Sequence, residues 1–131
     1  MFEEFLKEIK GYLPLTIISV DWSEPYFTIT GDNWNFVSLT EWRICNTSKI
    51  VRGCYDNDIQ KFISNLLNQK IVEVTPQSGM PFIDPTFILS NNLRIQFFSS
   101  SILEPWKIKL PNGKLYIASP SDEKWGVDLL I

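Results

Sequence analysis

Residues 25–39, with the sequence PYFTITGDNWNFVSL, decide the fold class of this chain. Aromatic and β-branched side chains are dense on both sides of Gly31-Asp32-Asn33, and such side chains favour the pleated surface of a β-strand. A run of glycine, aspartate and asparagine between two such segments is a turn signal. We therefore predict an antiparallel hairpin with strands over residues 25–30 and 34–39.

The same alternation of strand-like runs and polar turns continues along the chain in both directions. The further predicted strands cover residues 15–22, 42–46, 49–54, 71–74, 87–89, 93–98, 106–110 and 114–118. Ser90-Asn91-Asn92 and Pro111-Asn112-Gly113 are the predicted turns of two later hairpins, and an Asn-Gly pair is the strongest short-range hairpin signal. Most of the chain is therefore expected to be antiparallel β.

Two segments have helical spacing of their apolar residues instead. The first carries Phe2, Phe5, Leu6, Ile9 and Leu13 on one face and is expected to stop near Gly11 and Pro14. The second is expected to begin at Asp56, Asn57 or Asp58 and carries Ile59, Phe62, Ile63, Leu66 and Leu67 on one face. The sequence thus predicts an α+β fold with two amphipathic helices.

The order of helix and strands occurs twice, which predicts an internally duplicated helix-plus-antiparallel-strands unit in a single domain over residues 1–131. Unit one covers residues 1–56 and unit two covers 57–118, leaving 119–131 as a C-terminal tail. The clearest match pairs Glu41-Trp42-Arg43-Ile44 with Glu104-Pro105-Trp106-Lys107-Ile108, each followed by a turn and a lysine, Lys49 or Lys114. Chance similarity between two strand-rich halves is the alternative.

Further residues align between the halves. Phe5, Ile9, Ile17, Val20, Phe27, Ile29 and Trp34 correspond to Phe62, Leu66, Ile71, Val74, Phe87, Leu89 and Leu93, respectively. The tail adds Trp125 and three terminal aliphatic residues, 129–131, and we expect it to dock onto the body of the domain.

Composition excludes several classes of function. The 131 residues include no histidine, which excludes Ser-His-Asp and Cys-His catalysis and histidine-bound zinc. Two cysteines cannot complete a four-cysteine zinc site, so we expect no metal, and no glycine-rich phosphate loop is present, so we expect no cofactor. A net charge of −3 argues against binding to the phosphate backbone of nucleic acid.

The sequence has no signal peptide and no apolar run long enough to span a membrane, so we expect no membrane association and a cytoplasmic location.

The segment Asp21-Trp22-Ser23-Glu24-Pro25 is the preferred candidate for binding a protein partner. An aromatic residue flanked by acids could anchor a basic surface, with Asp32 and Glu41 adding negative charge. The alternative is that Trp22 packs beneath its loop.

Glu41 and Glu104 occupy matching places in the two halves, so a carboxylate-based enzyme is a further alternative. The competing interpretation is that each glutamate caps or pairs near its hairpin beside Trp42 and Trp106, with Arg43 or Lys107 on a neighbouring strand as one option for a partner.

The second half also carries a family resemblance, on the helix end at residues 66–71, the hairpin at 87–95, Glu104-Pro105-Trp106 and the turn Pro111-Asn112-Gly113. It resembles a loosely defined family of small uncharacterised bacterial proteins with a helix, a hairpin turning into a leucine-rich strand, and a Glu-x-Trp hairpin. Several such proteins are encoded beside secreted toxins, so the resemblance implies an immunity-protein role and brings no catalytic residues. The leading hypothesis is a non-enzymatic protein that binds a basic toxin domain, and the alternative is an oligomerising structural domain.

Overall fold

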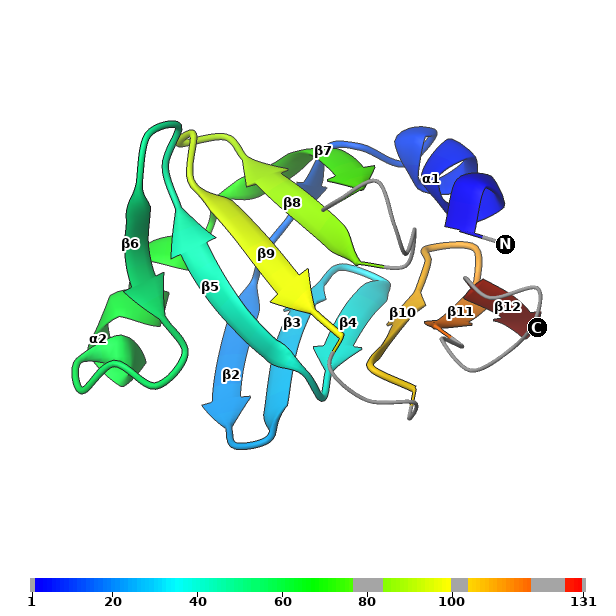
Figure 1. The fold of residues 1–131 in the computed structure, drawn as a ribbon. Coiled ribbons are helices and arrows are strands. Elements are labelled where there is room, and N and C mark those ends of the chain that lie inside the picture. Colours follow the sequence, from blue (N-terminus) through cyan, green and yellow to red (C-terminus); the bar gives the residue numbers. More distant parts are fainter. Residues whose placement is uncertain (1, 77–83, 100–103, 119–126, 131) are drawn as a thin grey trace.

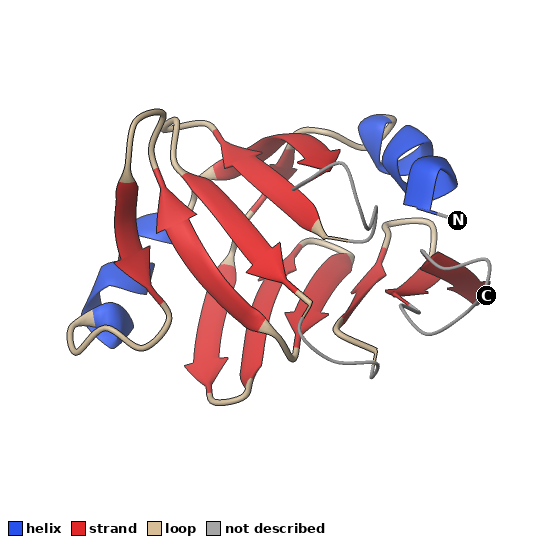
Figure 2. Ribbon diagram, in the orientation of Figure 1, coloured by secondary structure: helices blue, strands red, loops and turns tan. Residues whose placement is uncertain are grey.

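A computed structural model of the chain describes residues 2–76, 84–99 and 104–118, together with the backbone of 127–130. In it, two antiparallel sheets face each other across a hydrophobic core, with a helix at either side (Figures 1 and 2). The predicted α+β class, mostly antiparallel β with two helices, is confirmed.

The described strands form two six-stranded sheets, here called sheet A and sheet B. Sheet A has the order β1 (Leu15–Thr16), β7 (Lys70–Pro76), β8 (Pro85–Leu89), β9 (Arg94–Phe98), β5 (Glu41–Cys45) and β6 (Ile50–Gly53). Sheet B has the order β12 (Val127–Leu130), β11 (Leu115–Ala118), β10 (Trp106–Lys109), β4 (Trp34–Ser38), β3 (Tyr26–Gly31) and β2 (Ser19–Ser23).

Each sheet combines strands from both halves of the chain. In sheet B the first-half strand β4 pairs with the second-half strand β10, which sets Trp106 opposite Ser38. In sheet A the second-half strand β9 pairs with the first-half strand β5, which sets Trp42 opposite Phe97. The β5–β6 hairpin of the first half therefore completes sheet A, and the β10–β11 hairpin of the second half completes sheet B. The internal duplication itself stays a prediction.

The segment predicted as one strand over residues 15–22 forms two strands, β1 in sheet A and β2 in sheet B. The backbone N–H of Ile17 donates to the carbonyl of Gln69, at 2.9 Å, beside sheet A. The N–H of the next residue, Ile18, donates to Thr30 of β3 in sheet B, at 2.8 Å. The single-strand prediction is wrong because consecutive residues bond to different sheets, so the chain crosses between them at Ile17–Ile18.

Helix α1 (Phe2–Lys10) buries Phe2, Phe5 and Ile9, as its spacing predicts. The Phe5 ring lies 5.2 Å from Trp106 and 5.3 Å from Tyr116 between ring centroids, so the helix packs on the β10–β11 hairpin. The Glu8 carboxylate accepts hydrogen bonds from Lys114 Nζ, at 2.7 Å, and from the Tyr116 hydroxyl. These bonds fix α1 to a hairpin more than a hundred residues away in sequence.

The second helix is shorter than predicted. A single α-helical turn, α2 (Ile59–Phe62), continues as a 3-10 turn, η1 (Ile63–Leu66). Leu67 then adopts an extended conformation and is 39% exposed, so its place on a buried helical face is a wrong prediction. The Gln60 side chain donates to the Trp22 carbonyl, at 2.6 Å, which holds this segment against β2.

The tail contributes strand β12, whose residues Val127–Leu130 pair with Ala118–Leu115 of β11. Docking of the tail is therefore confirmed for the backbone of residues 127–130. Trp125 and Ile131 lie outside the described residues.

Candidate protein-binding surface

Trp22 belongs to the core and not to the surface. It lies on β2, is 8% exposed, and makes an edge-to-face contact with Trp42 at 5.4 Å between ring centroids. Phe27 contacts it from the neighbouring strand at 6.4 Å. The alternative interpretation, in which Trp22 packs inside the protein, therefore fits the structure. Trp22 faces the space between the sheets, while Asp21 and Ser23 face outward.

The exposed aromatic residue beside Trp22 is Tyr55, which is 60% exposed. Its ring centroid lies 6.3 Å from that of Trp22. The backbone around it is well fixed, since Cys54 N–H donates to the Trp42 carbonyl at 3.1 Å and Gly53 N–H donates to the Asp56 carboxylate at 2.9 Å. Sequence reasoning missed Tyr55, although its position between a strand and the acidic turn 56–58 is a signal of exposure.

Glu24, in the β2–β3 turn, and Glu41, at the start of β5, are both exposed, and both lie close enough to Tyr55 to act on its phenol electrostatically. Desolvation raises the pKa of the Tyr55 phenol, and the charges of Cys54, Glu24 and Glu41 raise it further. Burial likewise raises the pKa of the Cys54 thiol, with Glu41 and Glu24 adding to the effect. We call Glu24, Glu41 and Tyr55 the acidic aromatic patch.

The other two predicted partner-binding acids lie elsewhere. Asp21 is exposed on the outer face of sheet B, where its carboxylate accepts a hydrogen bond from the Ser23 hydroxyl at 3.0 Å. Asp32 lies in the β3–β4 turn, at the far end of β3 from Glu24. At about 3.3 Å per residue, β3 separates the two turns by roughly 20 Å. The structure thus brings together Trp22, Glu24 and Glu41, and it separates Asp32 from them.

A second surface lies on the outer face of sheet B. A hollow of about 270 Å³ is lined mainly by apolar side chains. Its lining residues are Tyr26, Val37, Leu39, Glu104, Trp106, Lys107 and Ile117, here called the sheet B hollow. Tyr26 is 53% exposed and Leu39 is 46% exposed, so two large side chains with apolar surface are accessible at this hollow.

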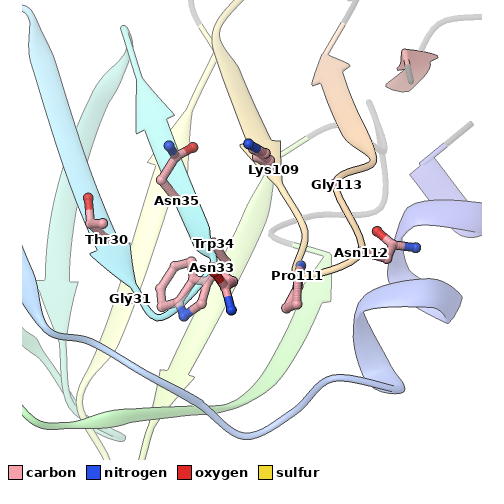
Figure 3. A pocket seen from close by; sticks show the side chains of 9 residues that line it. All are labelled: Thr30, Gly31, Asn33, Trp34, Asn35, Lys109, Pro111, Asn112 and Gly113. Atoms are coloured by element: carbon pink, nitrogen blue, oxygen red, sulfur yellow. The ribbon is translucent and has the colours of Figure 1, made fainter.

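A third, polar recess of about 440 Å³ lies between the β3–β4 turn and the β10–β11 turn (Figure 3). Its polar side chains are the amides of three asparagines and the Thr30 hydroxyl, together with the Trp34 indole and Lys109, which is the only charged group among the residues that line it. The lining residues are Thr30, Gly31, Asn33, Trp34, Asn35, Lys109, Pro111, Asn112 and Gly113. This lining contains no acid–base pair.

Glu41 and Glu104 face different surfaces. Glu41 begins β5 in sheet A, opposite Phe98, whereas Glu104 precedes β10 and lines the sheet B hollow. Arg43 Nε donates to Gln96 at 2.7 Å, and its guanidinium lies 4.7 Å from the centre of the Phe98 ring. The ion pairs of the described residues do not include Arg43, so the pairing of Glu41 with Arg43 that the competing interpretation allows is not found there.

Within the described ranges, no group of three or more cysteine and carboxylate side chains is placed to hold a metal ion. No helix in the same part of the chain is long and apolar enough to cross a membrane. Cys45 and Cys54 are both buried free thiols.

No protein-family model, no curated protein and no solved structure matches this chain. The resemblance to immunity-protein-like bacterial families consequently stays a prediction, and the surfaces described above carry the functional argument.

Proposed function

We propose that this chain is a non-enzymatic protein-binding module, an immunity protein that neutralises a bacterial toxin in the cytoplasm by covering its active site or another functional surface. The observation that supports the proposal is the acidic aromatic patch, in which exposed Tyr55 lies beside Glu24 and Glu41 on a buried Trp22–Trp42 pair. Exposed tyrosines on a rigid base are favoured as interface hot spots because they add contact area at low entropic cost.

The charge of the patch indicates the chemistry of the partner. Glu24 and Glu41 attract lysine or arginine side chains, and complementary charges raise the association rate and orient the partner before contact. Tyr55 offers its ring face to an arginine or lysine and its hydroxyl to a hydrogen-bond partner. The partner we propose is therefore a toxin domain with a basic surface, such as one that holds a nucleic-acid substrate.

Affinity capture with matched variants tests this proposal. The wild-type protein and the variants E24K/E41K, Y55A and D32K are each used to capture partners from lysate of the source organism. We expect one stoichiometric partner on the wild type and on D32K, and its loss on E24K/E41K and Y55A, because Asp32 is an exposed acid outside the patch. The captured partner should inhibit growth when expressed alone, and co-expression of this chain should relieve the inhibition.

Two results would contradict the proposal. Capture of the same partner by all four proteins would show that the patch does not bind it. A partner whose expression leaves growth unchanged would exclude the immunity role while leaving a protein-binding role in place.

A further inference from the structure

The outer face of sheet B is a candidate contact surface distinct from the acidic aromatic patch. Helix α1 packs on Trp106 and Tyr116, whose side chains face the core, and α2 is hydrogen-bonded to β2 through Gln60, so among the described elements neither helix covers the outer face. The sheet B hollow lies on this face, and exposed Tyr26 and Leu39 form its rim. Exposed apolar side chains gathered at a hollow mark a contact surface.

The charges of the hollow indicate which partner would fit. Glu104 and Lys107 are its charged lining residues, and both are exposed. The ion pairs of the described residues join Arg52 to Asp58 and Lys114 to Glu8, so Glu104 and Lys107 do not pair with each other within the chain. Among the described residues, neither charged group has an ion-pair partner within the chain. Lys107 lies between Val37 and Ile117 on the neighbouring strands, and Glu104 precedes the same strand as Lys107.

A surface with this arrangement is complementary to itself. Glu104 and Lys107 are three residues apart, which is roughly 10 Å along extended backbone. A twofold axis between them would place Glu104 of one copy against Lys107 of the other, and the reverse pair would form at the same time. The exposed side chains of Tyr26 and Leu39 on each copy would then meet the hollow of the opposite copy.

We propose that the sheet B hollow is the interface of a twofold-symmetric homodimer, in which two reciprocal Glu104–Lys107 ion pairs are flanked by the apolar side chains of Tyr26, Val37, Leu39 and Ile117. This inference goes beyond the proposed function and uses other residues. The acidic aromatic patch stays outside the interface, so a dimer would present two patches to toxin molecules.

Sedimentation equilibrium on the purified chain tests the proposal directly. We expect the average mass of the wild type to rise from monomer to dimer with concentration. E104K and K107E should each raise the dimer dissociation constant at least about tenfold, because each reversal creates two like-charge pairs by symmetry. The double variant E104K/K107E restores both pairs with opposite polarity and should dimerise within about threefold of the wild type, since intact pairs contribute little either way.

A matched control and an apolar variant complete the experiment. K109E changes a lysine on the same face of the same strand but outside the hollow, and it should leave dimerisation unchanged. L39D should abolish the dimer while retaining the far-ultraviolet circular dichroism of the wild type, because Leu39 is largely exposed.

Three results would overturn the proposal: a wild-type mass that stays monomeric at every concentration, single reversals without effect, or a double variant as weak as the single ones. Because this readout uses the isolated chain, it can fail while toxin capture succeeds, and the reverse also holds.

Discussion

Phe27 and Trp42 stack across the space between the two sheets, with ring centroids 4.1 Å apart and ring planes inclined by 23°. Phe27 belongs to β3 of sheet B and Trp42 to β5 of sheet A, and both side chains are at most 2% exposed. The stack is a direct link between the sheets and lies beneath Trp22, which supports the acidic aromatic patch. A substitution that removes this stack should therefore lower the stability of the core and the order of the side chains in the acidic aromatic patch.

The variant F27A tests this link. Truncation of a buried phenylalanine removes its transfer free energy and leaves a cavity, so we expect the free energy of unfolding to fall by about 3–5 kcal/mol. Urea denaturation followed by tryptophan fluorescence measures it. The control I50A removes an aliphatic side chain that is 55% exposed, and its effect should stay within about 0.5 kcal/mol. A loss below about 1 kcal/mol for F27A would show that the stack contributes little.

The Glu8 cluster predicts a pH-dependent contribution to stability. Hydrogen bonds from Lys114 and then Tyr116 lower the pKa of Glu8 below its ordinary 4.5. A lowered carboxyl pKa in the folded state stabilises the fold above the ordinary pKa, and this contribution disappears as pH falls through the folded value. E8Q should therefore lose about 1 kcal/mol at neutral pH and show a flatter decline of stability as the pH falls below 4.5.

Thermal denaturation as a function of pH measures this effect. The control E4Q changes an exposed glutamate of the same helix and should retain the acid-side slope of the wild type. Parallel pH curves for wild type and E8Q would rule out the assigned linkage.

Gly31 is predicted to be intolerant of any side chain. A Cβ at this position would lie well inside contact distance of the Trp34 indole and of the Thr16 carbonyl oxygen. Trp34 is 3% exposed, and Thr16 is backbone-paired to β7, so neither neighbour moves away freely. We expect G31A to lower the free energy of unfolding by about 1–3 kcal/mol, as overpacking does.

The matched variant is G11A. A Cβ on Gly11 meets only the Glu8 carbonyl oxygen, at 3.4 Å, which is ordinary contact. This variant should range from neutral to about 1 kcal/mol more stable, because alanine restricts the unfolded chain. Equal effects of the two substitutions in chemical denaturation would refute the close packing at Gly31.

The phenol of Tyr55 reports the geometry of the acidic aromatic patch. Desolvation is the largest cause of its raised pKa, and the charges of Glu24 and Glu41 contribute to the rest. The variant E24Q/E41Q should therefore lower the pKa of Tyr55 without returning it fully to the ordinary value of 10.0. Phenolate absorbance isolates this titration when the curve of Y55F is subtracted, and D32N serves as the control. An unchanged Tyr55 titration in E24Q/E41Q would place the two glutamates away from it.

Local patterns predict most of the secondary structure because strands, tight turns and the first helix depend on neighbouring residues. The turn at Gly31-Asp32-Asn33 forms where its residue types indicate, with Asn33 at a φ of 62°. The break at Ile17–Ile18 was not predictable, since both residues favour strands and the two sheets that divide them are assembled from distant segments. The 3-10 turn that shortens the second helix likewise depends on its packing against β2.

The site was only partly predictable for a related reason. Composition identifies acids and aromatics, but burial decides which of them a partner can reach. The sequence favours Trp22 as the exposed aromatic anchor, but Trp22 lies on the inward side of β2 and is buried. Tyr55 is the exposed aromatic residue instead, because it lies in the turn that follows β6. The proposed alignment matches Phe27 with Phe87, but their strand partners differ in kind, because Phe27 pairs with Ser38 and Phe87 pairs with Ile95.

The pairing of β5 with β9 and of β4 with β10 has a consequence for how the chain reaches its native state on the ribosome. When residues up to Gly53 have emerged, the β5–β6 hairpin has no sheet to join, because β9 begins only at Arg94. The exposed strand edges of the nascent chain stay open until the second half is synthesised, and contacts of such long sequence separation form slowly. The two halves of this molecule therefore acquire their structure together, late in translation, and a protein truncated at residue 56 should emerge as a target for chaperones and proteases.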